Sequence, residues 1–263
     1  MQPIKTTEIP AAITDYLKNI KSIKFPRQGC TSDVGIIEST QGTYALKRAK
    51  GDLYCSWLDK EIVVLNCLSN QTTLPVPKVI KYVKQAKLNE CWALLEFIEG
   101  ETVRAALSKE ENKEQRRKIL VNFGAILAQI HATPCPGELR NTHWLSRMLE
   151  EADFFLENYQ VDGNKELLEK MKKTKPTSYV STLIHGDFTI DNVLVSAGEI
   201  TGVIDWGRGD FGDPRYDAAL AVQPRTNIFD ERVDKELFFK GYGDNIIDEN
   251  IYDFYVNGLY EFF

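Results

Sequence analysis

Apolar and polar positions in the first hundred residues repeat mostly with the short period of β-strands. The stretch "SIKFPRQGCTSDVGIIESTQGTYALKRA" divides into short β-rich runs, punctuated by Gly29, Gly35 and Gly42. Two later apolar runs, "LPVPKVIKYV" and "CWALLEFIEG", predict two more strands. The segment "LDKEIVVLNCLS" has helical spacing instead, so this half of the chain is predicted to be strands interrupted by one helix.

Beyond Gly100 the pattern changes to that of amphipathic helices. Further helical patterns cover residues 141–159 and 164–173 and the tail from 213 to 263, and two short strands, "TLI" and "GVID", bracket a polar motif. The segment "RRKILVNFGAILAQIHA" has a wide apolar helix face, formed by Ile119, Leu120, Phe123, Ile126, Leu127 and Ile130.

This change of pattern predicts an α+β fold with two lobes. A β-rich N-terminal lobe, residues 1–97, is followed by a mainly helical C-terminal lobe, residues 98–263, with a hinge near residues 96–101. A chain of 263 residues is long enough to bury a core in each lobe.

The polar motif between the two short strands is "LIHGDFTIDNVLV", which contains H-G-D-x-x-x-x-N with His185, Asp187 and Asn192. Protein kinases have the same aspartate-to-asparagine interval in their catalytic loop. Asp205 follows in "GVIDWG", at the predicted end of a strand. Two carboxylates and an amide suit phosphoryl transfer, because a base must orient the attacking hydroxyl and a hard cation needs oxygen ligands. The alternative is a hairpin in which these side chains only form turns.

The N-terminal half supplies residues for binding phosphate. Lys47 lies in the predicted strand "TYALKRA", and Glu61, which we expect to open a helix, is placed to pair with it. An exposed Lys–Glu pair would be ordinary solvated charge. Before Lys47, the loop "RQGCTSDVGII" has Gly29 and small polar residues such as Ser32, whose backbone N–H groups suit a phosphate. The order of all these features along the chain favours a kinase-like catalytic site over a set of turns.

Composition and charge exclude several other classes. Lys and Arg total 32 against 38 Asp and Glu, so the net charge of −6 argues against nucleic-acid binding and suits a cationic small ligand. The five cysteines form no C-x-x-C pair, so neither a disulfide framework nor a zinc site is expected. Without a signal sequence or an apolar run long enough for a membrane helix, the protein is expected to be cytoplasmic.

With these motifs, the sequence resembles the aminoglycoside phosphotransferase family, which shares the protein-kinase fold. The resemblance extends from about residue 20 to Phe263 and is most specific in "HGDFTIDNVLV" and "GVIDWGRGDFGDPRYDAAL". Gly207 and Arg208 directly after Asp205, and the acidic-aromatic end "GLYEFF", are most similar to the aminoglycoside 3'-phosphotransferase branch. Trp206 departs from the smaller apolar residue that is frequent in that branch, and residues 141–180 have no residue-by-residue match.

The resemblance implies catalytic and metal-binding roles in the C-terminal lobe. Asp187 would be the catalytic base, and Asn192 and Asp205 would bind Mg²⁺. Arg208 would lie near the transferred phosphate, and Asp217 would brace the catalytic loop.

For the N-terminal lobe the resemblance implies nucleotide binding. Lys47 would hold the phosphates of ATP, Glu61 would position Lys47, and the backbone of Glu96 and Ile98 would contact adenine. GTP is an alternative nucleotide, because "LLEFIEG" does not indicate a preference.

For the acceptor the resemblance implies a pocket lined by Asp187, Glu261 and the terminal carboxylate of Phe263. His131 lies on an apolar helix face and is expected to be a core residue.

The leading hypothesis is an ATP-dependent kinase that acts on a hydroxyl of a cationic aminoglycoside, as a monomer or a dimer, with no nucleic-acid or membrane partner. A related kinase acting on choline, a macrolide, a sugar or a homoserine-like metabolite is the alternative. A nucleotide-binding pseudokinase is disfavoured, because Lys47, Asp187, Asn192 and Asp205 are all present.

Overall fold

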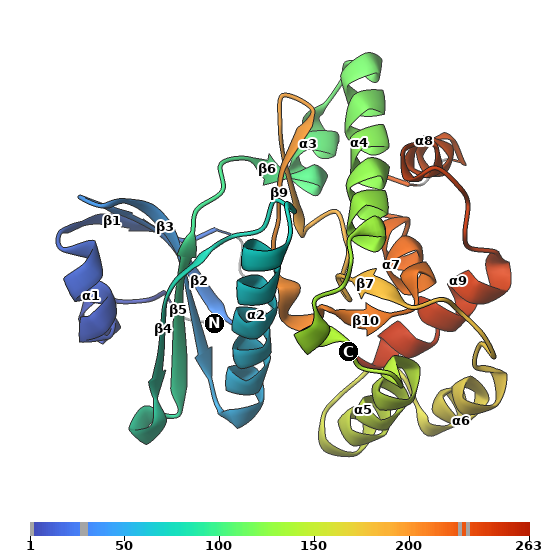
Figure 1. The fold of residues 1–263 in the computed structure, drawn as a ribbon, viewed down its shortest axis with the longest axis horizontal. Coiled ribbons are helices and arrows are strands. Elements are labelled where there is room, and N and C mark those ends of the chain that lie inside the picture. The colour runs from blue at the N-terminus through green and yellow to red at the C-terminus, as the bar shows by residue number, and fades with distance from the viewer. Residues whose placement is uncertain (1–2, 27–30, 226–227, 230–231) are drawn as a thin grey trace. The chain divides into compact units, whose positions relative to one another are not determined.

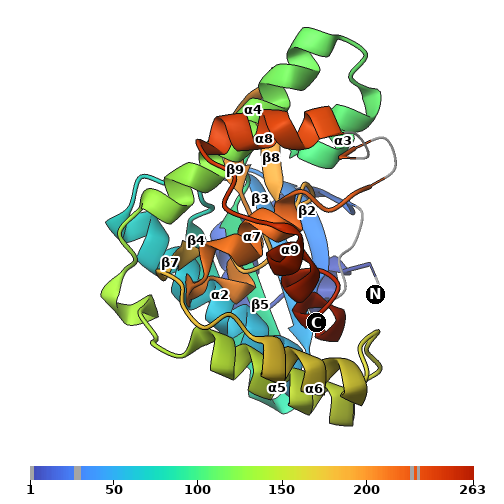
Figure 2. The same ribbon diagram turned by 90° about the vertical axis from the view of Figure 1, so that its right-hand side faces the viewer.

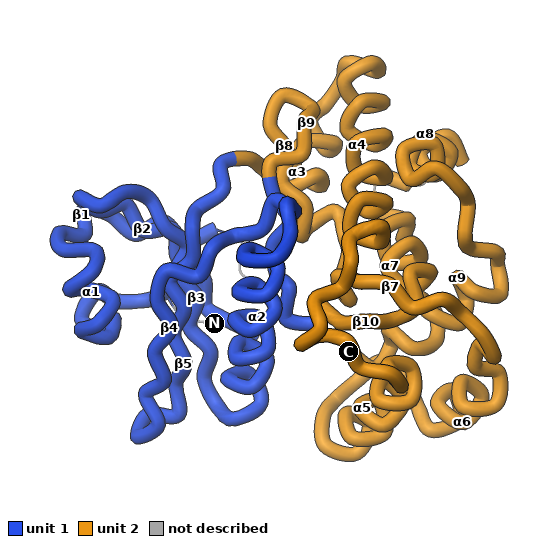
Figure 3. Tube along the Cα trace, viewed as in Figure 1, with its two compact units in different colours: residues 1–99, 202–208 blue, residues 100–201, 209–263 orange. Residues whose placement is uncertain are grey.

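The computed structural model describes residues 3–26, 31–225, 228–229 and 232–263. The chain divides into two compact units, Met1–Glu99 with Gly202–Arg208, and Gly100–Thr201 with Gly209–Phe263 (Figure 3). The predicted assignment of nucleotide binding to residues 1–97 and catalysis to residues 98–263 stays a prediction. In the described ranges, every helix is too short or too polar to cross a membrane.

The first unit is built on a five-stranded antiparallel sheet in the order β1-β2-β3-β5-β4. Its strands are β1 (Ile20–Lys24), β2 (Asp33–Ser39), β3 (Gly42–Lys50), β4 (Val79–Gln85) and β5 (Glu90–Glu96). Its helices are α1 (Ala11–Leu17) and α2 (Asp52–Gln71), with short 3-10 helices η1 (Thr6–Glu8), η2 (Ala86–Leu88) and η4 (Trp206–Arg208).

The sheet and α2 form because each has one apolar face. Burial alternates strictly along β2, as expected of a strand with one face against the core. Helix α2 lies along the sheet in Figure 1 and buries Leu58, Ile62 and Leu65. The predicted strands and the central helix are confirmed, whereas α1, which buries Ile13 and Leu17, was not predicted.

Two details of the first unit differ from the prediction. Helix α2 begins at Asp52, so Glu61 lies in its middle and does not open it, because the weakly patterned segment before Leu58 is also helical. Gly35 is a residue of strand β2, opposite Leu46, and does not belong to the turn before it. Gly29, the other glycine predicted to line a phosphate loop, lies outside the described residues.

The second unit is mainly helical and carries short strands. Strands β7 (Thr182–Ile184) and β10 (Asp210–Gly212) pair with each other, and a second small sheet has the order β6 (Glu101–Thr102), β8 (Val193–Ser196) and β9 (Glu199–Val203). Its helices are α3 (Val103–Lys109), α4 (Lys113–Ala132), α5 (Trp144–Asn158), α6 (Lys165–Thr174), α7 (Pro214–Ala221), α8 (Arg232–Tyr242) and α9 (Glu249–Tyr255), with η3 (Gly137–Leu139) and η5 (Leu259–Phe262).

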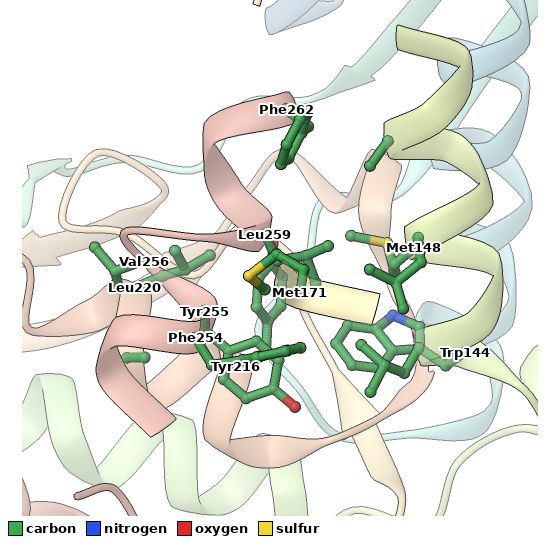
Figure 4. Packing of buried hydrophobic residues seen from close by; sticks show 14 of the residues in the cluster. Trp144, Met148, Met171, Tyr216, Leu220, Phe254, Tyr255, Val256, Leu259 and Phe262 are labelled. Atoms are coloured by element: carbon green, nitrogen blue, oxygen red, sulfur yellow. The ribbon is translucent and has the colours of Figure 1, made fainter. Parts of the chain in front are cut away.

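An aromatic and aliphatic core holds the second unit together. It gathers residues from α5, α6, β7, α7, α9 and η5, with Trp144 packed against Tyr216 and Tyr255 (Figure 4). Helices α5 and α6 lie side by side over this core (Figure 2). The predicted helices near 116–132, 141–159 and 164–173 and in the tail are confirmed.

The remaining differences concern short elements near the polar motif. Strands β6, β8 and β10 were not predicted, because runs of two to four residues have no detectable periodicity. Strand β9 ends at Val203, so Asp205 follows the strand after one intervening residue. The α+β class itself is confirmed.

Helices α4 and α8 cross at very close range. A Cβ atom at Gly124 would lie 1.9 Å from the Phe238 carbonyl oxygen, and one at Gly241 would lie 1.9 Å from the Val121 carbonyl oxygen. Both contacts are with backbone, which cannot turn away as a side chain can. The two glycines therefore set the separation of this helix pair, which lies side by side in Figure 1.

We predict that Gly124→Ala lowers the free energy of unfolding by about 1–3 kcal/mol, because the added methyl group overpacks a backbone contact. Gly137→Ala is the matched control, since a Cβ there meets nothing within 4 Å, and its effect should stay within about 0.5 kcal/mol. Chemical denaturation measures both. Equal stability of the two variants would contradict the close crossing.

Candidate active site

A buried carboxylate fixes the turn that carries the H-G-D motif. Asp217, on α7, is fully buried and accepts the N–H of His185 at 2.6 Å and the N–H of Gly186 at 2.8 Å. Gly186 has φ +80°, a conformation that glycine adopts without strain. The turn after β7 is thereby held in one shape directly before Asp187, so Asp217 braces the loop as the family resemblance implied.

His131 packs behind this brace. Its Nε2 lies 3.5 Å from Asp217 Oδ2, and its Nδ1 lies 2.8 Å from the Tyr242 hydroxyl. Burial raises the pKa of Tyr242 to about 12, so the phenol keeps its proton at neutral pH. The expectation of a core histidine is confirmed, because the imidazole contacts the brace and has a side chain only 6% exposed.

Asp187 and Asn192 are held against each other within the loop. The Asn192 Nδ2 group donates to the Asp187 carbonyl oxygen at 2.8 Å and to its Oδ2 at 2.9 Å. Both amide hydrogens are used in this way, so the Asn192 Oδ1 atom is the one turned away from Asp187. The loop is also tied to α3, because Arg104 forms a bidentate pair with Asp191 at 2.5 and 2.6 Å.

The C-terminal 3-10 helix η5 adds a residue that the sequence reasoning missed. The Tyr260 hydroxyl donates to Asp187 Oδ1 at 3.2 Å. Of the two residues predicted to line the acceptor pocket together with Asp187, Glu261 accepts the Gly163 N–H at its backbone carbonyl, and Phe263 packs its ring against Phe155 with centroids 5.7 Å apart. Their roles in binding an acceptor stay predictions.

In the first unit, Lys47 lies between two carboxylates. Its Nζ atom lies 2.6 Å from Glu61 Oε1 and also contacts Asp205 Oδ1. Burial alone would lower the pKa of Lys47, but Asp205 and Glu61 together outweigh this effect and raise the pKa above its ordinary value. The predicted Lys47–Glu61 pair is therefore confirmed as a buried contact, and the ammonium is charged at any physiological pH.

Asp205 combines an unusual backbone with an open carboxylate. Its φ of +63° lies in the left-handed region, which is uncommon for residues other than glycine. Its side chain is 48% exposed although it contacts Lys47. A positive φ at an exposed acid next to a buried lysine is a feature typical of functional sites.

The two residues predicted to bind magnesium, taken one at a time, have side chains suited to that ion. Within the described ranges, no three His, Cys, Asp or Glu side chains gather as a metal cluster. Mg²⁺ does not need such a cluster, because one or two protein oxygens suffice when phosphates and water complete the shell. The second unit offers the amide oxygen of Asn192 and the first unit the exposed carboxylate of Asp205, each a ligand of this kind.

The other predicted residues lie as follows. Arg208, in η4, places its guanidinium 5.5 Å from the ring centroid of Trp57 on α2. Glu96 ends β5 and donates its N–H to Lys78. Ile98 follows β5 in a segment without regular secondary structure, and its N–H has no backbone partner among the described residues. Ser32 is half-buried directly before β2.

Comparison with known proteins establishes the family. Residues 22–250 match the phosphotransferase enzyme family known as APH, and the chain belongs to that family. It is 28% identical over 229 residues to an aminoglycoside 3'-phosphotransferase of Escherichia coli, covering 83% of this chain and 80% of the relative. It is 24% identical over 241 residues to an aminoglycoside 3'-phosphotransferase of Niallia circulans, covering 86% and 87%.

Solved structures agree on the fold. The GDP complex of aminoglycoside 2'-phosphotransferase-IIIa superposes with a TM-score of 0.66 at 17% identity, over 92% of this chain and 84% of that one. The streptomycin–ATP–APH(2")-IIa ternary complex gives a TM-score of 0.64 at 19% identity, over 90% and 82%. The predicted family and fold are confirmed.

We predict that Asp217→Asn lowers the free energy of unfolding by about 2–4 kcal/mol, because an amide cannot replace a carboxylate that accepts two backbone N–H groups. Loss of the fixed turn should also lower turnover. Asp253→Asn is the matched control, as this side chain is 56% exposed in a loose 3.7 Å pair with Lys170. Equal stability of the two variants in denaturation experiments would mean that the Asp217 hydrogen bonds do not stabilise the fold.

Proposed function

We propose that this protein is an ATP-dependent phosphotransferase that transfers the γ-phosphate to a hydroxyl of an aminoglycoside. The observation that carries the proposal is the Asp187 carboxylate, held by Asn192 on a loop that Asp217 braces. Membership of the phosphotransferase enzyme family and the likeness to aminoglycoside 3'-phosphotransferases support it. We expect the enzyme to act in the cytoplasm, as a monomer or a dimer.

The nucleotide is assigned to the first unit. Lys47 would neutralise phosphate oxygens, and Glu61 holds its ammonium in place through the 2.6 Å contact. A nucleotide phosphate would meet a charged partner here, since the pKa of Lys47 is raised. The backbone of Ile98 and Glu96 would contact adenine, and the segment with Ser32 would lie over the phosphates.

Mg²⁺ would be held by Asn192 and Asp205. When bound, the ion neutralises charge on the phosphate oxygens during transfer. Of the chain's own residues, Asp205 would have to exchange part of its contact with Lys47 for the ion, and its exposed carboxylate allows this. Arg208 would add positive charge near the transferred group.

In the reaction, Asp187 would accept the proton of the acceptor hydroxyl. The acceptor oxygen forms a bond to the γ-phosphorus, the bond from that phosphorus to the bridging oxygen breaks, and ADP leaves. Catalysis of this kind depends mainly on positioning and charge, which is why a rigid loop matters.

The acceptor is proposed to be cationic. Glu261 and the terminal carboxylate of Phe263 follow directly after Tyr260, which contacts Asp187, so negative charge adjoins in sequence a residue that touches the base. The net charge of −6 adds a long-range attraction for a polycation.

The direct test is a phosphorylation screen of the purified protein against aminoglycosides, choline, macrolides, sugars and homoserine, with ATP and with GTP. We expect turnover of an aminoglycoside. Asp187→Asn should lower this turnover by about 10²–10⁴-fold, the range for loss of a general base. Transfer only to another alcohol would show that the substrate is not an aminoglycoside. An absence of any transfer would favour a pseudokinase.

We predict that Asp205→Asn lowers activity and raises the Mg²⁺ concentration needed for half-maximal activity by at least about tenfold, because the amide keeps an oxygen ligand but loses its charge. Raising the Mg²⁺ concentration should restore part of the activity. Asp15→Asn, on the exposed face of α1, is the matched control. An unchanged Mg²⁺ titration in Asp205→Asn would remove this residue from the metal site.

A further inference from the structure

The two oxygens of the Asp187 carboxylate have different partners. Asn192 donates to Oδ2 at 2.9 Å from within the same loop, and the Tyr260 hydroxyl donates to Oδ1 at 3.2 Å from the C-terminal helix η5. Asp187 and Tyr260 are both half-buried, so neither is sealed from solvent. The base is therefore already paired with a hydroxyl group of the protein itself.

That hydroxyl is in the position that an acceptor needs. A general base must lie within hydrogen-bond reach of the proton that it removes. Oδ2 is engaged by the amide of Asn192, which the loop fixes, so we assign an incoming alcohol to Oδ1. A phenol and an alcohol offer the same O–H donor, and the two groups would compete for this atom.

We propose that the Tyr260 hydroxyl occupies the acceptor's place on Asp187, and that an acceptor must displace it before phosphoryl transfer. The proposal rests on the proposed function, because it takes Asp187 as the base. It assigns Tyr260 as a gate for acceptor binding rather than as a reacting group. It also predicts low transfer to water, which meets the same occupied oxygen when no acceptor is bound.

The surrounding packing allows the side chain to move while the helix stays in place. Leu259 and Phe262 on either side of Tyr260 are fully buried in the core of the second unit. The backbone of η5 is also tied down, because Glu261 accepts the Gly163 N–H at 2.9 Å. Gly163 lies so close to Phe262 that a Cβ there would be 2.5 Å from the ring. Release of Asp187 would therefore come from a rotation of the Tyr260 side chain, with the backbone of η5 in place.

Tyr260→Phe tests the gate, since it removes one oxygen and keeps the ring. Tyr252→Phe is the matched control, because Tyr252 packs against the same core from α9 and lies over Lys235. For each variant we would measure thermal stability, acceptor Kd by calorimetry with a non-hydrolysable ATP analogue, acceptor KM and kcat, and ATP hydrolysis without acceptor. Kanamycin would be the first acceptor, followed by any alcohol that the screen identifies.

In Tyr260→Phe we expect the acceptor Kd and KM to fall by about three- to tenfold, since the acceptor no longer displaces a hydrogen bond to a charged group. ATP hydrolysis without acceptor should rise by a similar factor, and kcat should not fall. Tyr252→Phe should match the wild type in every measurement. This separation of KM from kcat is not expected of a residue that only supports the fold.

Three results would overturn the gate. A lower kcat with unchanged Kd would mean that Tyr260 stays on Asp187 and orients it during catalysis. Unchanged Kd and unchanged hydrolysis in Tyr260→Phe, with an active wild type, would mean that the contact has no role, while the proposed function would stand. A wild type that neither phosphorylates an alcohol nor hydrolyses ATP would refute the proposed function and the gate with it.

Discussion

The buried carboxylate of Asp217 is the constraint on which the catalytic loop depends. A carboxylate removed from water must be fully hydrogen-bonded, and Asp217 meets this need with the N–H groups of His185 and Gly186. The helix that carries it is anchored in turn. Its N-cap Asp213 accepts the Tyr255 hydroxyl at 2.6 Å, and burial together with the Asp213 charge raises the pKa of Tyr255 well above its ordinary value. The aromatic core, the helix and the loop thus form one connected support for Asp187.

The first unit places its charged groups in a different way, by pairing them with one another. Burying Lys47 is costly, and the carboxylates of Glu61 and Asp205 compensate for it. The triad joins β3, α2 and the segment 202–208, which returns to this unit from a distant part of the sequence. That segment is secured by the Val203 N–H on the Pro75 carbonyl at 2.8 Å, so the acid opposite Lys47 is held by the backbone as well as by charge.

The sequence predicted those features that depend on a pattern within one segment, and it missed those that depend on contacts between distant segments. Helix α4 was predicted because its apolar face repeats over many turns, and the order of Lys47, Glu61 and the H-G-D-x-x-x-x-N motif indicated a kinase-like site. The start of α2 was missed, since its first turns have weak periodicity. The contact between Tyr260 and Asp187 could not be predicted from a local pattern, because it joins residues 73 positions apart. In that part of the chain the sequence favoured the charged Glu261 as the pocket residue and gave no reason to choose Tyr260.

The central claim is that Asp187 on its braced loop promotes transfer of the γ-phosphate to an alcohol. The most direct measurement uses ATP labelled with ¹⁸O at the γ-phosphoryl oxygens and mass spectrometry of the acceptor. The account predicts an aminoglycoside that gains a phosphoryl group with all of the labelled oxygens, bridged through the acceptor's own unlabelled hydroxyl oxygen. Label found only in inorganic phosphate, with the acceptor unchanged, would contradict it.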